Sequence, residues 1–343
     1  MVLLKKFFFV LILTCLIGNG VYAQTSNPQQ YKYVFTVAKD GTGDYTYIQD
    51  AIDAMRGFPL APITLYIKNG VYNEKIELPA NNTDVSFIGE SVDKTIITFN
   101  DYAGRGKIRT FTSFTAKISG NRFVAENITF VNSAGPVGQA LALYVDADKA
   151  VFKNCRFIGN QDTIYAGGEN SRQYFNECYI EGTTDFIFGP STAVFQNCTI
   201  RAKSNSYITA ANTTAGKKFG FVFLDCKIIV DTAVTKLYLG RPWRAFSKTG
   251  FIRCELPEQI TPEGWDNWGN PENEKTVFYA EYKNRGKGAG ITKRVSWAKQ
   301  LSDKEANEYT VENIFETVNA MPVSAADWFR QGTKSFEWPV GKK

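Results

Sequence analysis

Short runs of alternating apolar and polar residues recur along the chain at intervals of 20 to 28 residues. The clearest repeat lies between Asn154 and Gly189, where Cys155 aligns with Cys178 at a period of 23 residues. Equivalent segments surround four more positions, Ile128, Cys198, Cys226 and Cys254. A period of this length, punctuated by Gly and Asn, is typical of a solenoid of parallel strands. The sequence therefore predicts an all-β fold with six coils in register.

A helical pattern interrupts the strands near the N-terminus. Four apolar residues fall on one face at helical spacing: Ile48, Ala51, Ile52 and Met55. Thr46, followed three residues later by Gln49, predicts a capping box, and Gly57 with Pro59 ends the pattern. Because the terminal repeats of a solenoid must be covered, we expect this helix to cap the first coil.

A second helical signal lies near the other end of the chain. Ser302 with Glu305 predicts another capping box and a helical stretch through about Phe315. We expect this stretch to cap the opposite end of the solenoid. Trp328 and Trp338, in the tail that follows, are expected to be packing residues.

The first 23 residues have the pattern of a secretory signal peptide. Lys5 and Lys6 precede an apolar run from Phe7 to Ile17, and the small residues ending at Ala23 suit cleavage. We therefore expect an exported protein, extracellular or periplasmic, whose residues 24–343 form a single domain. No other segment is apolar for long enough to span a bilayer, so no membrane span is predicted.

Composition excludes several kinds of chemistry. The chain has no histidine, which removes Ser/His/Asp and Cys/His nucleophilic systems and His-based zinc sites. It also lacks an acidic cluster of the kind that binds calcium, so no metal site is predicted. The formal net charge is only +5, without a basic cluster interleaved with aromatic residues, and no nucleic-acid partner is expected.

The five cysteines outside the signal peptide share one position of the repeat. Their side chains should run parallel about 4.8 Å apart, which is too far for disulfides. We therefore expect small, buried, unpaired core residues. The glycosylation sequons at Asn127 and Asn197 are interpreted in the same way, as a ladder of stacked turn asparagines that includes Asn154.

Two aspartates occupy one repeat position. Asp162 and Asp185 each follow a cysteine by seven residues, so they should stack about 4.8 Å apart on neighbouring coils. Two carboxyl groups this close do not both ionise easily, and such a pair supplies an acid and a nucleophile from one residue type. The third copy carries Asn205 at this position. The alternative interpretation is a solvated ladder of turn residues.

Polar and aromatic residues in three neighbouring segments add to this pair. Gln139 lies beside the strand of the coil before Asp162, and Gln161 is adjacent to Asp162. Side-chain amides can donate hydrogen bonds to a developing oxyanion. Arg241 and Trp243 flank a proline in the segment LYLGRPWRAF. An isolated glutamine in a loop is usually an ordinary polar residue of the protein surface, but two near a carboxylate pair indicate a catalytic site.

Four motifs occur in order along the chain: GQALAL, GNQDTIYA, GTTDFIFG and LGRPW. Together with the earlier NGVYNE, they make the chain resemble the pectin methylesterase (pectinesterase) family. The similarity extends from about Val34 to Tyr309. It implies a right-handed parallel β-helix and a carboxylic ester hydrolase that uses no metal or other cofactor. The implied substrate is methyl-esterified homogalacturonan (pectin), converted to pectate and methanol through an acyl-enzyme by a monomeric protein.

The resemblance also implies a role for each matching residue. Asp185 corresponds to the nucleophile and Asp162 to the general acid and base, a distinction that the stacked repeat alone leaves open. Gln139 and Gln161 correspond to the oxyanion-stabilising glutamines. Arg241 corresponds to the residue that keeps the nucleophile charged.

Three further residues are expected to contact the substrate. Trp243 matches an aromatic wall of the family's site, and Phe188 and Thr184 flank the nucleophile. Thr184 departs from the apolar residue expected before the nucleophile, which bears on sugar contacts and fine specificity.

Two other functions fit a stacked carboxylate pair. A glycosidase or lyase acting on the same polymer would use carboxylates about 5 Å apart and would cleave the chain. A non-catalytic carbohydrate-binding solenoid would use the aspartates only as turn residues. Methanol release without new reducing ends separates the esterase from both.

Overall fold

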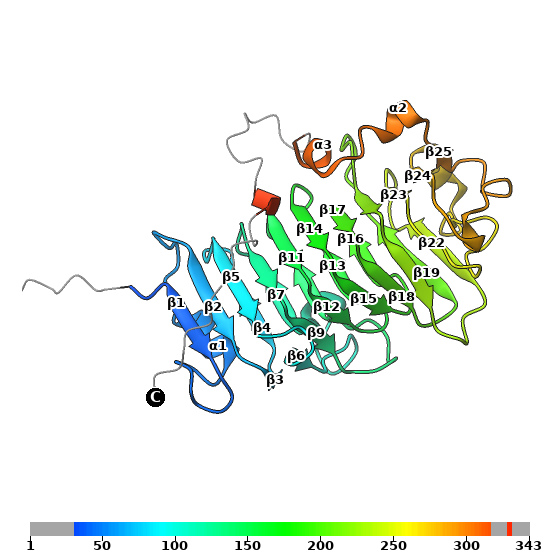
Figure 1. Cartoon of the computed structure of the whole chain (residues 1–343). Helices are drawn as coiled ribbons and strands as arrows, with labels where there is room; N and C mark the ends of the chain where they lie inside the picture. Colours follow the sequence, from blue (N-terminus) through cyan, green and yellow to red (C-terminus); the bar gives the residue numbers. More distant parts are fainter. Residues whose placement is uncertain (1–30, 317–327, 331–343) are drawn as a thin grey trace, which may run out of the picture. The chain divides into compact units, whose positions relative to one another are not determined.

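The computed structural model describes residues 31–316 and 328–330. The chain divides into two units, Met1–Lys32 and Tyr33–Lys343, and the second contains all the strands and helices described below. Every paired strand runs parallel to its neighbour, in three sheets, which confirms the predicted parallel β-helix (Figure 1). Successive strands along the chain belong to sheets A, B and C in turn over most of the solenoid, so three strands make one coil.

Sheet A is the longest of the three. Its eleven strands, in spatial order, are β1 (Val34–Val37), β2 (Ile63–Ile67), β5 (Val85–Gly89), β8 (Val124–Glu126), β11 (Ala150–Lys153), β14 (Arg172–Asn176), β17 (Thr192–Gln196), β20 (Phe221–Leu224), β23 (Lys248–Ile252), β24 (Phe278–Tyr282) and β25 (Lys299–Gln300).

Sheets B and C have seven strands each. Sheet B consists of β3 (Gly70–Asn73), β6 (Thr95–Phe99), β9 (Thr129–Asn132), β12 (Arg156–Ile158), β15 (Tyr179–Gly182), β18 (Thr199–Ala202) and β21 (Lys227–Val230). Sheet C consists of β4 (Ile76–Leu78), β7 (Ala116–Ile118), β10 (Leu143–Val145), β13 (Ile164–Ala166), β16 (Ile187–Gly189), β19 (Ser206–Ala211) and β22 (Leu237–Pro242).

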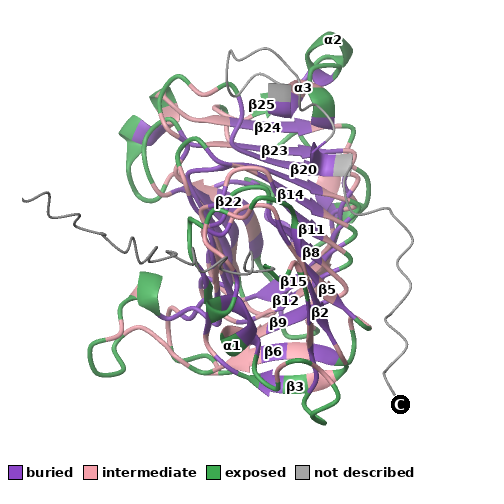
Figure 2. Cartoon of the chain, turned by 90° about the vertical axis from the view of Figure 1, so that its left-hand side faces the viewer, coloured by how far each residue is buried: buried purple, intermediate pink, exposed green. Residues whose placement is uncertain are grey.

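A column of phenylalanine rings fills the interior behind sheet A (Figure 2 shows the buried inner faces in purple). Its members are Phe152, Phe175, Phe195, Phe223 and Phe251, stacked with ring centroids 4.8, 4.7, 4.6 and 4.3 Å apart and planes within 12° of parallel. These separations are close to the strand spacing. The repeat therefore places one ring per coil at the same position, and each ring stacks on the next.

The five cysteines are buried and unpaired, as the repeat predicts. Each thiol points at a backbone carbonyl of the preceding coil; for example, Cys178 Sγ lies 3.4 Å from the oxygen of Phe152 and Cys198 Sγ 3.4 Å from that of Phe175. Burial raises the pKa of the Cys155 thiol to about 12. These residues are therefore small core groups, and a thiol that stays protonated near neutral pH is unreactive.

The turn before each cysteine places one non-glycine residue in the left-handed conformation. Asn127 and Asn154 have φ of 59° and 47°, a region in which asparagine is enriched, and Asn154 Nδ2 donates to Asn127 Oδ1 at 2.7 Å. The predicted ladder stops there, because Glu177 with φ of 56° occupies the next coil, before Asn197. The prediction of a ladder through Asn197 was wrong on this point.

The prediction that Asn205 extends the aspartate column was also wrong. The register between coils is 20 residues where Tyr179 pairs with Thr199, but 22 where Ile187 pairs with Thr209. Two extra residues therefore enter between β18 and β19. Asn205 lies in this insertion and accepts hydrogen bonds from the backbone of Thr235 and Lys236.

Helix α1 (Ile48–Asp53) buries the predicted apolar face against the core of the first coils. Its predicted capping box is absent: Tyr47 is the N-cap residue and makes no side-chain capping bond. The carboxylate of Glu74 takes that role and accepts from the backbone N–H groups of Ile48 and Gln49, at 2.8 and 3.2 Å. Glu74, which is distant in the sequence, thus accepts the helix N–H groups in place of Thr46, the local acceptor that the sequence pattern indicated.

The C-terminal helical stretch forms two short helices, α2 (Asp303–Ala306) and α3 (Val311–Glu316). The capping box of Ser302 and Glu305 is confirmed. The helices do not cap the end of the solenoid, however: Figure 1 shows α3 alongside the strands of sheet A. Its residues Ile314 and Phe315 belong to one apolar cluster with Val194 of β17. The last coils are instead closed by aromatic residues that pack in series, Trp265, Tyr279 and Trp297.

Four short 3₁₀ helices complete the described secondary structure: η1 (Thr110–Thr112), η2 (Pro271–Lys275), η3 (Lys287–Ala289) and η4 (Trp328–Arg330). The predicted signal peptide and Trp338 lie outside the described residues. Within the described ranges, no helix has both the length and the apolar character needed to cross a membrane.

Candidate active site

Asp162 and Asp185 lie on neighbouring coils, in the turns that lead into β13 and β16. The N–H of Asp162 donates to the carbonyl of Thr184 at 3.1 Å, and β13 pairs with β16 so that Ile164 is opposite Ile187. The two aspartates are therefore stacked, as predicted. Both are almost fully buried, at 4% and 6% exposure, and both adopt left-handed backbone conformations, with φ of 64° and 49°. Aspartate is among the residues enriched in this conformation, which the turns between the coils also use at other positions.

Arg241 holds Asp185 through two parallel hydrogen bonds. Its Nε donates to Oδ1 at 3.0 Å and its Nη2 to Oδ2 at 2.7 Å. The residue reaches across sheet C from β22, two strands away from the β16 coil. A bidentate pair of this geometry fixes the orientation of the carboxylate as well as its charge.

Two aromatic rings enclose the guanidinium of Arg241. Its Cζ lies 3.9 Å from the ring centroid of Tyr207 and 3.7 Å from that of Trp268. Trp268 is itself in a left-handed conformation, with φ of 63°, and its N–H donates to Asp266 at 2.7 Å. This aromatic clamp, Tyr207 with Trp268, shields the ion pair from water.

The sequence analysis missed both members of the clamp. Tyr207 is the residue of β19 opposite Asp185, since the N–H of Asp185 donates to its carbonyl at 2.9 Å. A correct register for the third coil would have placed it there instead of Asn205. Trp268 lies in a loop beyond the repeats, and its sequence carries no signal that it folds back over Arg241.

Burial and nearby charges affect the pKa values of the two carboxyl groups differently. Burial first, and the charge of Asp185 second, raise the pKa of Asp162 to about 8. Burial also raises the pKa of Asp185, but the hydrogen bonds and charge of Arg241 oppose this effect. The first proton therefore leaves Asp185. Burial makes a larger contribution to keeping Asp162 protonated than the neighbouring carboxylate on which the sequence argument relied.

The two glutamines lie on adjacent coils next to the acids. Gln139 and Gln161 form a parallel bridge, and the N–H of Ala140 donates to the carbonyl of Gln161 at 3.1 Å. The Gln139 side chain forms a hydrogen bond with Asp162 that lowers the pKa of this acid. Both glutamines are half-buried, so their amides border the acid pair and remain partly open to solvent.

Aromatic residues line the outer face of sheet C beside the acids. Trp243 contacts Phe188 at 5.8 Å between ring centroids, and Phe188 contacts Tyr165 at 5.1 Å. The row continues to Tyr144, 4.9 Å from Tyr165, and Phe111 lies over it. Tyr144 and Phe111 were missed, although the alignment of Tyr165 with Phe188 in the repeat indicated a column of rings.

The three predicted substrate contacts differ in exposure. Phe188 is only 4% exposed because neighbouring rings cover it, whereas Trp243 is half-buried and Phe111 is 42% exposed. Thr184 is half-buried, and its hydroxyl accepts from Ser206 Oγ at 2.8 Å. In this row Phe111 is therefore the most accessible ring, and Trp243, Tyr165 and Tyr144 are half-buried.

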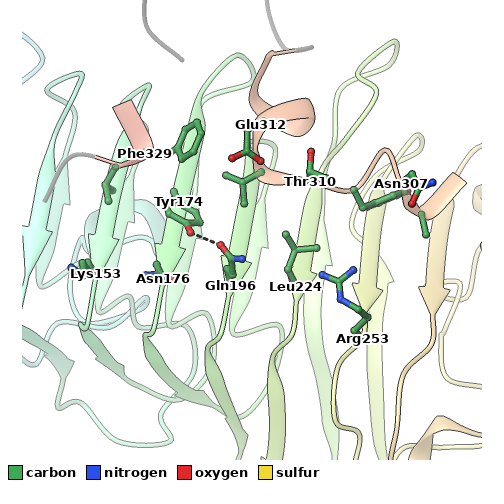
Figure 3. Close-up of a pocket in the computed structure, with 14 residues that line it drawn as sticks. Lys153, Tyr174, Asn176, Gln196, Leu224, Arg253, Asn307, Thr310, Glu312 and Phe329 are labelled. Atoms are coloured by element: carbon green, nitrogen blue, oxygen red, sulfur yellow. Dashed lines mark hydrogen bonds between the residues drawn. The ribbon is translucent and has the colours of Figure 1, made fainter. Parts of the chain in front are cut away.

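A cavity of about 690 Å³ lies elsewhere, between the outer face of sheet A and the C-terminal segment. Figure 3 shows its floor, which includes Tyr174, Gln196 and Leu224. None of the predicted site residues lines it. Among the described residues, no group of three acidic, cysteine or histidine side chains is arranged to hold a metal. The stacked acids, with their glutamines and arginine, are therefore the candidate active site.

Comparisons with known proteins agree with the predicted resemblance. The family model described as Pectinesterase matches residues 34–318. The protein named "Probable pectinesterase/pectinesterase inhibitor 58" of Arabidopsis thaliana is 41% identical over 289 residues, which cover 80% of this chain and 50% of that protein. This chain thus spans about half the length of that relative.

Two solved structures share the fold. A pectin methylesterase from carrot is 32% identical, with a TM-score of 0.81 over 88% of this chain and 97% of that one. A mutant pectin methylesterase in complex with a hexasaccharide is 30% identical, with a TM-score of 0.73 over 82% of this chain and 96% of that one. On this similarity in sequence and structure, the chain belongs to the pectinesterase family.

Proposed function

We propose that this protein hydrolyses the methyl esters of homogalacturonan in pectin and releases methanol and pectate. The observation that carries the proposal is one buried carboxylate, Asp185, held by a bidentate guanidinium beside a second, Asp162, whose pKa is about 8. When their environments make the pKa values of two carboxyl groups differ in this way, the ionised group can act as the nucleophile and the protonated group as the acid. The predicted signal peptide, 1–23, fits a polymer substrate outside the cytoplasm, and the protein acts as an exported monomer.

The first half-reaction uses both acids and both amides. The ionised carboxylate of Asp185 attacks the ester carbonyl carbon and forms a tetrahedral anion. Amide N–H groups of Gln139 and Gln161 donate to the developing oxyanion. As the carbon–oxygen bond to the methoxy group breaks, Asp162 gives its proton to the leaving oxygen, and methanol departs. The product is an acyl-enzyme in which Asp185 is one half of an anhydride.

The second half-reaction restores the enzyme. The Asp162 carboxylate, now ionised, takes a proton from a water molecule that attacks the acyl carbon. The bond between the acyl carbon and Asp185 breaks, so Asp185 leaves as the carboxylate and returns to its pair with Arg241. Asp162 is protonated again, and the released galacturonic acid group loses its proton to solvent. The reaction as written needs no metal or cofactor, because Asp162 protonates the departing methanol and deprotonates the water, and Asp185 forms and releases the acyl bond.

The aromatic row gives the polymer a surface beside the acids. Trp243 and Phe111 expose ring area to solvent on this face, and sugar rings pack on such surfaces through their C–H groups. A family member that binds a hexasaccharide supports an extended oligosaccharide as ligand. Phe188, which neighbouring rings cover, supports this surface from below, and the half-buried Thr184 lies beside the nucleophile.

The proposed mechanism predicts that activity falls above about pH 8. Catalysis needs Asp162 protonated and Asp185 ionised, so the alkaline limb of kcat/KM follows the pKa of Asp162, about 8. Above that pH, activity should fall about tenfold per pH unit. Initial rates of methanol release between pH 5 and 10, corrected for base hydrolysis with an inactive variant, measure this limb. A flat profile up to pH 10 would contradict the acid role of Asp162.

The activity itself is tested with highly methylated pectin and the purified mature protein. We expect methanol release, unchanged by a metal chelator, without new reducing ends or unsaturated products. Chain cleavage without methanol would instead assign the acid pair to a glycosidase or lyase. If neither product forms while the protein still binds pectin, the solenoid is a carbohydrate-binding protein and the proposed activity is wrong.

A further inference from the structure

The amide of Gln139 is held by a hydroxyl group from a distant part of the chain. Thr110 Oγ1 donates to Gln139 Oε1 at 2.7 Å. Because the amide oxygen accepts from this donor, the NH₂ group of the same amide is the part that donates to Asp162, with which the Gln139 side chain forms a hydrogen bond. We propose that Thr110 is a positioning residue: its hydroxyl fixes the orientation in which Gln139 donates to the acid and to the oxyanion. This inference rests on the proposed function.

The turn that carries Thr110 is tied to the segment that carries Gln139. Ser113 donates to the carbonyl of Thr110 through both its N–H, at 3.1 Å, and its hydroxyl, at 2.7 Å. The same hydroxyl accepts from the N–H of Leu141 at 3.3 Å. Asn132 Nδ2 bridges the two segments, since it donates to the carbonyls of Ser113 at 3.0 Å and Leu141 at 3.1 Å. Thr110 and Gln139 are therefore held at a fixed separation.

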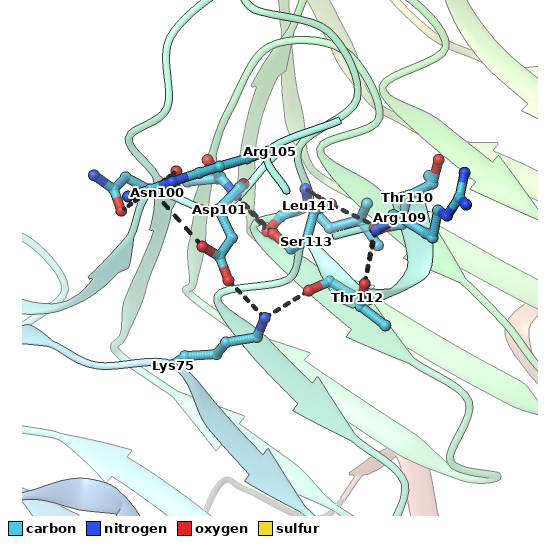
Figure 4. Close-up of polar contacts among 10 residues, drawn as sticks. Lys75, Asn100, Asp101, Arg105, Arg109, Thr110, Thr112, Ser113 and Leu141 are labelled. Atoms are coloured by element: carbon cyan, nitrogen blue, oxygen red, sulfur yellow. Dashed lines mark hydrogen bonds and ion pairs between the residues drawn. The ribbon is translucent and has the colours of Figure 1, made fainter. Parts of the chain in front are cut away.

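A lysine anchors the other side of this turn (Figure 4). Lys75 Nζ donates to the carbonyl of Thr112 at 2.5 Å and pairs with Asp101 at 2.7 Å. Arg109 and Thr112 close the turn with a bond of 2.9 Å from the N–H of Arg109 to the hydroxyl of Thr112. These contacts come from the scaffold and not from the substrate, so the hydroxyl of Thr110 is in place before the substrate binds.

Without the hydroxyl, the Gln139 oxygen loses this donor, so the amide also populates the flipped orientation. In the flipped orientation its oxygen faces Asp162, where it repels the ionised form. The charged groups that act on Asp162 are Asp185, which raises its pKa, and Arg241, which lowers it, and the hydrogen bond from Gln139 also lowers it. Loss of the Thr110 hydroxyl should therefore raise the pKa of Asp162 further.

The test compares Thr110→Val, which has the same shape without a donor, with Thr110→Ser, which keeps the donor. We expect T110V to lower kcat for methanol release about tenfold, the worth of one hydrogen bond, with little change in KM, and T110S to retain most of the activity. In a Gln139→Ala background, T110V should cause no further loss. Equal losses in the two Thr110 variants, or full additivity with Q139A, would overturn the proposal.

A direct titration keeps this test independent of turnover. The carboxyl ¹³C chemical shift of Asp162 is followed against pH in the wild-type protein, T110V and T110S, with melting temperatures as a check on folding. We expect a higher midpoint in T110V alone. An unchanged midpoint in folded T110V overturns the positioning role, whereas a wild-type protein that titrates as expected but releases no methanol counts against the proposed function only.

Discussion

Replacing Asp185 by asparagine is expected to reduce methanol release by about 10⁴-fold or more, because the amide cannot attack the ester. The fold should persist. Asparagine tolerates the left-handed conformation that Asp185 adopts, at φ of 49°, so the backbone is not strained. Arg241 loses its partner but stays between Tyr207 and Trp268. Initial rates and thermal melting of D185N measure the two outcomes.

A matched control for this variant exists on the same solenoid. Asp225 also has a left-handed backbone, with φ of 54°, and a bidentate arginine partner, Arg253, at 2.8 and 2.7 Å. It lies in the turn after β20, away from the acid pair. We expect Asp225→Asn to retain wild-type turnover. Activity of D185N within tenfold of the wild-type value would remove Asp185 as nucleophile.

Asp162→Asn is expected to lower kcat by about 10² to 10⁴-fold, the usual contribution of a general acid and base. The variant should also lose the alkaline limb near pH 8, because the group that titrates there is gone. Rates of methanol release across the pH range, measured beside the wild-type protein, test both effects.

The two variants together also test the assignment of roles. If D162N is more damaging than D185N, and D185N alone loses the alkaline limb, then the nucleophile and the acid are exchanged. The stacked geometry alone allows either order. The arginine bound only to Asp185 is the structural reason to expect Asp185 as the nucleophile and Asp162 as the acid.

The repeat predicted the solenoid because each coil carries its own local signal. Cys155, Cys178 and their equivalents mark the same turn on successive coils, so strand order and register followed from the spacing. The predicted register of the aspartate column was wrong after Cys198, where two residues are inserted before sheet C and no cysteine marks the shift. The C-terminal helices were found, but not their location, since an amphipathic helix suits the end of a solenoid and its side equally well.

The acid pair could be predicted for the same reason, as both aspartates belong to the repeat. Arg241 and Trp243 were placed by motif resemblance, because they come from a coil about 56 residues beyond Asp185. Trp268 could not be found in either way. Its contact with Arg241 depends on a loop closed by the Asp266 carboxylate, which lies outside the repeat.

The C-terminal segment along sheet A has a consequence for how the protein unfolds. In a bare solenoid each coil contacts only its neighbours, so coils can detach one at a time. In this protein the described part of this segment, from Leu301 to Phe315 with Trp328 and Phe329, shares one apolar cluster with strands from β8 to β24. Arg172 of β14 also donates to the carbonyl of Phe315. These residues contact several coils at once, and the coils beneath them should therefore unfold as one cooperative unit.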